Sequence, residues 1–252
     1  MEYKYFPHTE SEIKEMLDIV GVGSLDELYS DVPEEIRFKK EYDLPEAMSE
    51  MEVRRFFEAL GNENKRLVCF AGAGVYDHYT PAVVGRIVQR SEFLTSYTPY
   101  QAEISQGTLH YIFEYQSMMA ELTGMDISNA SMYDGSTATA EAMMMAVAAG
   151  KKCDTVLVSE TVDKKVLTVV KTYAKFHGVN IVMVEENDGI TDKADFQEKI
   201  AQKGVAGVIV QQPNRYGIVE DYAGYADAAH DNKALMIMNG VAADYAVLKT
   251  PA

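Results

Sequence analysis

The sequence predicts an α/β fold with a mainly parallel sheet, preceded by an N-terminal helical arm. After residue 154, short apolar runs alternate regularly with amphipathic segments. This alternation is typical of βαβ units, whose parallel sheet is covered by helices on both faces. Residues 1–66 are charged and carry helix-capping motifs instead. We therefore expect two parts, a helical arm over residues 1–66 and a large α/β domain over residues 67–252.

The arm is expected to hold three short helices. Thr9 and Glu12 form a capping box, in which each side chain satisfies a free amide group at a helix start. Ser49 and Glu52 repeat this arrangement before a second apolar periodicity. The predicted helices cover residues 9–20, 24–28 and 49–62.

The middle of the chain, residues 67–116, is dense in Tyr, Gly, Pro and small polar residues. Loops of this composition usually lie on a rigid scaffold and make functional contacts. A helix is expected from Ser105 to Leu122, ended by Gly124, and a second one after Asp134. The predicted strands that follow are 155–158, 180–184, 208–211 and 234–238, separated by helices over 164–176, 192–202 and 220–229.

Composition excludes several classes of protein. The 252 residues carry a formal charge of −16 and are 47% apolar, which is typical of a folded domain and unlike the basic surface of a nucleic-acid binder. No apolar run is long enough to span a membrane, and the N-terminus lacks the apolar core of a signal peptide. Two cysteines form no disulfide framework, so we expect a cytoplasmic protein.

The segment Gly135-Ser136-Thr137 has the chemistry of a phosphate site. Glycine allows a sharp turn, and the two hydroxyls lie beside the free amide groups of a helix N-terminus. An ordinary capped helix start explains the same residues and is the more frequent case.

Other candidate groups favour structural roles. His78 follows Asp77, and such a pair is more often a structural hydrogen bond than an acid/base couple. No His or Cys spacing fits a metal site. The lysines of the α/β part, Lys164 and Lys165 among them, lie at charged helix ends or faces, so we interpret them as solvated surface. The chain therefore offers no convincing Schiff-base lysine.

Several long motifs together carry a resemblance to one family. They are 6–9 (FPHT), 70–79 (FAGAGVYDHY), 90–93 (RSEF), 97–107 (YTPYQAEISQG) and 129–138 (NASMYDGSTA). In these motifs, and in register from Tyr5 to Pro251, the chain closely resembles the P-protein of the glycine cleavage system, glycine dehydrogenase (decarboxylating), and in particular the subunit 1 (alpha chain) of its two-subunit form.

The resemblance implies a PLP-dependent transferase of fold type I, which is aminotransferase-like. In that family glycine is decarboxylated on PLP, and the aminomethyl group passes to the lipoyl arm of the H-protein. It also implies that the PLP lysine lies in the partner, glycine dehydrogenase subunit 2 (beta chain), in an α2β2 assembly. The lack of a convincing lysine here agrees with that division.

Two departures from the pattern of PLP-bearing relatives concern the cofactor. Asp163 stands where those relatives have a His that stacks on the cofactor ring, and Asn239 where they have an Asp that pairs with the pyridine nitrogen. We therefore expect a vestigial cofactor pocket at Gly135, Ser136 and Thr137. The resemblance implies that the chain completes a substrate channel or partner site with Tyr76, His78, Tyr97, Tyr100, Gln101 and Glu103.

Two alternatives remain open on the sequence. The chain could be a non-catalytic structural or regulatory subunit that stabilises the PLP-bearing partner, or a self-sufficient PLP enzyme. The resemblance also implies that alpha chains continue beyond the position of Ala252, so we expect the large domain to be truncated at its C-terminal end.

Overall fold

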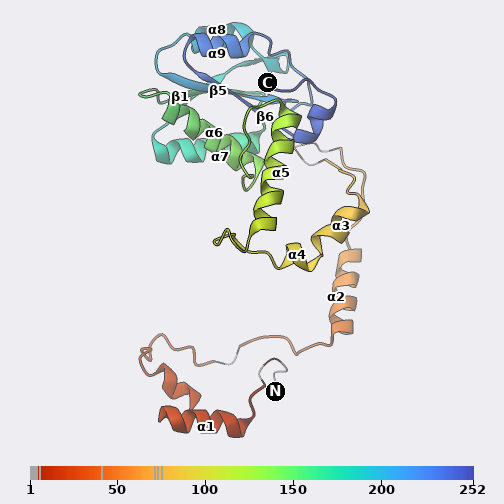
Figure 1. Ribbon diagram of the computed structural model, residues 1–252, viewed down its shortest axis with the longest axis vertical. Helices are drawn as coiled ribbons and strands as arrows, with labels where there is room; N and C mark the ends of the chain where they lie inside the picture. Colours follow the sequence, from red (N-terminus) through yellow and green to blue (C-terminus); the bar gives the residue numbers. More distant parts are fainter. Residues whose placement is uncertain (1–4, 6, 41, 71, 73, 75) are drawn as a thin grey trace. The chain divides into compact units, whose positions relative to one another are not determined.

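The computed structural model describes residues 5, 7–40, 42–70, 72, 74 and 76–252. The chain divides into two compact units, Met1–Val68 and Cys69–Ala252 (Figure 1).

The described residues of the first unit form three helices, α1 (Glu10–Val20), the 3-10 helix η1 (Leu25–Tyr29) and α2 (Glu50–Asn62). Both predicted capping boxes are confirmed: the Thr9 and Ser49 amide groups donate to Glu12 and Glu52 at 2.7 and 2.8 Å. No described residue of this unit is buried, and the helices expose their apolar faces.

The second unit begins with helices that pack loosely. The helices α3 (Ala82–Val88) and α4 (Ser91–Leu94) were not predicted, because neither is long enough to show a clear periodicity. The longer helix α5 (Gln106–Thr123) is confirmed, but none of its residues is buried. The next helix, α6 (Gly135–Ala149), is capped by Asp134 and has four buried residues.

A four-stranded parallel sheet organises this unit. Its strands are β1 (Thr155–Ser159), β2 (Asn180–Val184), β5 (Val205–Gln212) and β6 (Leu235–Gly240), in the order β2-β1-β5-β6. All three pairings are parallel, with Leu157 opposite both Val182 and Val208. The predicted strands are thus confirmed. A short antiparallel pair, β3 (Glu186–Asn187) and β4 (Ile190–Thr191), was not predicted.

Helices cover both faces of the sheet, as the apolar strands predict. One apolar cluster joins the sheet to α6 and α7 (Lys164–His177), and a second joins it to α8 (Lys193–Ile200) and α9 (Tyr225–Asp231). Figure 1 shows these two helix pairs on opposite sides of the strands. Gly207 lets α6 approach β5, because a Cβ there would lie 3.1 Å from that of Ala146 and 3.2 Å from the Leu235 carbonyl oxygen.

The helix predicted over 220–229 begins later, at Tyr225. Glu220 is buried, and its carboxylate accepts hydrogen bonds from the Thr191 amide and the Asn214 side chain, both at 2.7 Å. These contacts hold residues 213–224 as a folded loop over the sheet end. The 3-10 helix η2 (Ala242–Ala246) follows β6. None of the helices in the described part of the chain is both long and apolar enough to cross a membrane.

Candidate functional site

The strand order creates a crevice at the carboxyl ends of β1 and β5. After β1 the chain enters α7 on one face of the sheet, and after β5 it continues to α9 on the other face. The two connections diverge at this point, which in open α/β sheets is where ligands bind.

A cavity of about 610 Å³ occupies this crevice. Its walls come from the start of α6, the segments after β1, β5 and β6, and Gly74, Tyr76 and His78 of the Tyr-rich segment. It brings together several residues that the sequence singled out: Tyr76, His78, Gly135, Ser136, Asp163 and Asn239. Residues distant in the sequence thus meet at one site.

A network of uncharged amide groups connects the strand ends below the cavity. The Gln211 Oε1 atom accepts hydrogen bonds from the Asp163 backbone amide at 2.8 Å and from Asn239 Nδ2 at 3.1 Å. The Asn239 Oδ1 atom accepts a hydrogen bond from the Thr139 hydroxyl at 3.3 Å. Each side of the Asn239 amide thus has a neighbour within the chain, although the Thr139 hydroxyl shares its one proton with the Gly135 carbonyl oxygen at 2.8 Å.

The N-terminus of α6 is capped by its own carboxylate. Asp134 Oδ1 accepts the Thr137 amide hydrogen bond at 2.7 Å, and this bond holds the pKa of Asp134 below its usual range. A phosphate approaching Gly135 and Ser136 would therefore face a negative charge that already uses the Thr137 amide. The capped-helix interpretation accounts for this segment.

These observations decide whether the cavity fits PLP. A pyridinium nitrogen needs a carboxylate partner. Asn239 offers an amide instead, and its Nδ2 group donates a hydrogen bond to Gln211. The phosphate end would meet the Asp134 carboxylate. At these two positions, Asn239 and the start of α6, the residues present do not fit PLP. Nor do the described residues include a cluster of three His, Cys, Asp or Glu groups that could hold a metal ion.

The end of β5 and the loop after it, residues 213–224, were not recognised as part of the site from the sequence. Gln212 is bonded to Glu220 twice, through Nε2 to the carbonyl oxygen at 2.8 Å and through Oε1 to the amide at 2.9 Å. Asn214 Oδ1 accepts the amide hydrogen bonds of Tyr216 and Ile218. The loop thereby presents Arg215 to the cavity. Its position directly after a buried strand was the available signal.

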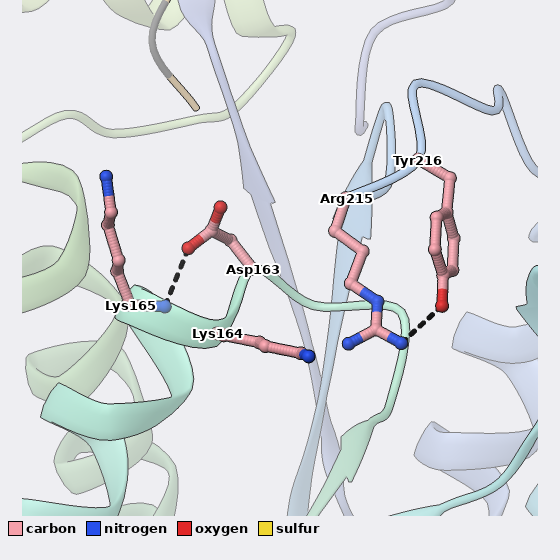
Figure 2. Close-up of a pocket in the computed structure, with 5 residues that line it drawn as sticks. All are labelled: Asp163, Lys164, Lys165, Arg215 and Tyr216. Atoms are coloured by element: carbon pink, nitrogen blue, oxygen red, sulfur yellow. Dashed lines mark hydrogen bonds between the residues drawn. The ribbon is translucent and has the colours of Figure 1, made fainter. Parts of the chain in front are cut away.

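A second pocket, of about 280 Å³, adjoins this loop and is lined by Asp163, Lys164, Lys165, Arg215 and Tyr216 (Figure 2). Three of its five lining side chains are cations. Lys164 and Lys165 are exposed, as expected for solvated lysines, but they belong to the pocket wall rather than to an open helix face.

The remaining predicted residues lie elsewhere in the second unit. Tyr97, Tyr100, Gln101 and Glu103 are exposed and do not line the cavity. Tyr97 and Tyr100 belong to the segment that joins α4 to α5, and their ring centroids lie 6.3 Å apart. The structure therefore brings together two of the six predicted channel residues, Tyr76 and His78, in the cavity.

Comparison with known proteins gives a consistent result. Residues 3–252 match the family described as "Glycine cleavage system P-protein". "Probable glycine dehydrogenase (decarboxylating) subunit 1" of Bacillus pumilus is 49% identical over 242 residues, 95% of this chain and 54% of the relative. The protein of the same description from Moorella thermoacetica is 50% identical over 233 residues, 92% of this chain and 52% of the relative.

Among solved structures, the chain is similar to a glycine decarboxylase (P-protein) of the glycine cleavage system in inhibitor-bound form. The TM-score is 0.87 at 40% sequence identity, over 100% of this chain and 56% of that one. The chain thus spans about half the length of the relatives that it matches.

Proposed function

Because the chain belongs to the glycine cleavage system P-protein family, we propose that it acts as the alpha subunit of glycine dehydrogenase (decarboxylating). With a beta chain that holds PLP covalently, it contributes to decarboxylating glycine and transferring the aminomethyl group to the lipoyl arm of H-protein. We propose an α2β2 assembly in the cytoplasm. The two free cysteines, Cys69 and Cys153, are compatible with that compartment.

The single observation that carries this division of labour is the amide network below the cavity. Asn239 is bonded to Gln211 and Thr139, so the position that would hold a cofactor's ring nitrogen is occupied by neutral groups. A chain of this family without a cofactor site of its own needs a partner that has one. The relatives' designation as "subunit 1" supports the existence of such a partner.

The Tyr-rich segment supports a role in contacting that partner. Tyr79, Tyr97 and Tyr100 are 90%, 82% and 80% exposed. Exposed aromatic side chains gathered in one segment are typical of protein interfaces. We propose that Tyr97, Tyr100, Gln101 and Glu103 complete the beta chain's site and the approach of the lipoyl arm. Tyr76 and His78 serve the same channel from the cavity side. In this scheme the arm, 1–66, and the α/β part, 67–252, are separate modules.

Reconstitution tests the proposal. The chain and a lysine-bearing beta subunit are purified separately and mixed, and glycine-dependent CO2 exchange is followed in the presence of H-protein. We expect exchange only in the mixture, and no absorbance band of a lysine-bound PLP from this chain alone. Exchange by this chain with PLP but without the partner would instead identify a self-sufficient enzyme.

The uncharged amide network below the cavity also favours a second function, a non-catalytic subunit that only stabilises its partner. Tyr100→Phe and Glu103→Gln separate the two, because both side chains are exposed and their loss leaves the fold intact. If the complex forms normally and exchange falls, the channel role holds. Unchanged exchange in a stable complex supports the structural role. Tyr133→Phe, at a side chain 97% exposed outside the proposed channel, is the matched control.

A further inference from the structure

The first turn of α7 carries an unfavourable arrangement of charge. Lys164 and Lys165 are the first two residues of this 14-residue helix, and the turn contains no acidic residue. The N-terminus of a helix is the positive end of its dipole, where cations destabilise the helix. The N-cap Asp163 offsets part of this charge by accepting the Lys165 backbone amide at 2.7 Å. In a chain of net charge −16, such a local concentration of cations calls for an explanation.

A third cation faces the same pocket from another element. Arg215 lies on the loop after β5, and its guanidinium is directed toward the Lys164 ammonium across the pocket (Figure 2). The Asp163 carboxylate is turned toward Lys165 and away from Lys164 in the same view. The Lys164 and Arg215 cations thus face the same pocket, and Arg215 is also paired with the Glu186 carboxylate at 2.9 Å.

The Arg215 guanidinium is only partly satisfied within the described residues. Its Nη2 atom donates to Glu186 Oε2 at 2.9 Å and to the Tyr216 hydroxyl. Its Nε atom is buried and has no hydrogen-bond partner in the part of the chain that the structure describes. The guanidinium carbon lies over the Tyr216 ring, 4.6 Å from the ring centroid. A buried donor without an acceptor is costly, so the intramolecular bonds printed for the guanidinium do not satisfy all of its donors.

We propose that this pocket is an oxyanion subsite, in which a phosphate or carboxylate group binds between the Lys164 ammonium and the Arg215 guanidinium. The ligand's oxygens neutralise the two facing cations, and the positive end of α7 adds to the attraction. The volume of about 280 Å³ admits a small anion. The subsite lies at the α7 end of the crevice, apart from the α6 N-terminus that Asp134 already caps. The proposal does not depend on the reaction proposed above.

Calorimetric titration of the full chain tests the subsite. Inorganic phosphate and sodium acetate are titrated separately, with sodium chloride holding the ionic strength constant. We expect saturable binding of at least one of the two anions. Lys164→Gln should weaken it about tenfold, which corresponds to about 1.4 kcal/mol, because one charged hydrogen bond to the anion is lost. Lys164→Arg should retain most of the affinity.

Lys171→Gln is the matched control, because it removes the same charge from an exposed position on the same helix. It should bind like the wild type. Preference for phosphate or for acetate identifies the ligand class, and both results support the subsite. Absence of saturable binding of either anion overturns the proposal, as does equal weakening by Lys164→Gln and Lys171→Gln. None of these outcomes depends on the beta chain, so they are separable from the exchange assay.

Discussion

Replacing Glu220 by glutamine is the most informative single perturbation of the site. The two side chains have nearly the same volume, so the substitution changes hydrogen bonding without opening a void. Glu220 is 7% exposed, and its two carboxylate oxygens each accept one hydrogen bond at 2.7 Å, from the Thr191 amide and from Asn214 Nδ2. A glutamine has only one acceptor oxygen, so its NH2 group must face one of these two donors.

The neighbouring groups cannot adjust to this change. The Thr191 amide is part of the backbone, and Asn214 cannot exchange its oxygen and nitrogen, since its Oδ1 already accepts the Tyr216 and Ile218 amides. The variant loses one charge-assisted hydrogen bond, weakens the other and leaves buried donors unpaired. From the usual contributions of such bonds, we expect the free energy of unfolding to fall by about 2–4 kcal/mol.

Urea denaturation, followed by circular dichroism, measures this change. The control is Glu198→Gln on the exposed face of α8, which should change the free energy of unfolding by less than about 0.5 kcal/mol. Because the same loop holds Arg215, we also expect Glu220→Gln to weaken anion binding in folded protein. Equal stability of Glu220→Gln and the wild type would refute the role assigned to the carboxylate.

Further predictions concern the core and the pH dependence. Phe196→Ala removes a side chain that is 0% exposed and whose ring centroid lies 4.3 Å from that of Tyr225. We expect the free energy of unfolding to fall by about 3–5 kcal/mol in the same urea titration. Phe176→Ala, at a side chain 77% exposed, is the control and should lower it by less than about 0.5 kcal/mol. Burial, reinforced by the negative charges of nearby acidic residues, raises the pKa of Tyr225 from 10.0 to about 12. The unfolded chain then loses this proton at lower pH than the folded chain, so the free energy of unfolding should fall as pH rises from 10 to 12. Tyr225→Phe should make that fall less steep when unfolding is measured at alkaline pH. An unchanged slope would contradict the assignment.

Local chemistry was sufficient to predict much of the fold. The capping boxes at Thr9 and Ser49 are each complete within four residues, and the structure contains both. The apolar runs of the sheet are equally local, and each became a parallel strand. The start of α9 was mispredicted for the opposite reason. Glu220 continues a helical pattern in the sequence, and its true partner, Thr191, is remote in the chain.

The candidate site divides in the same way. Gly135 and Ser136 were found because a helix start is a local pattern, and both line the cavity. Gln211 and Arg215 were missed, because their significance depends on which strand lies beside which. Lys164 was interpreted as solvated surface, since only the strand order places it opposite the loop after β5. Whether the exposed Tyr97 and Tyr100 belong to a channel depends on a partner and stays a prediction.

The strand order also determines when the sheet can form during synthesis on a ribosome. β1 and β2 can pair as soon as β2 itself has emerged, because they are neighbours both in the chain and in the sheet. The other side of β1 pairs with β5, where Thr155 lies opposite Val205, so that side stays open until α8 and β5 have emerged. Open edges of apolar strands are prone to aggregate. The interval between the synthesis of β2 and of β5 is therefore when the nascent protein most needs protection by a chaperone.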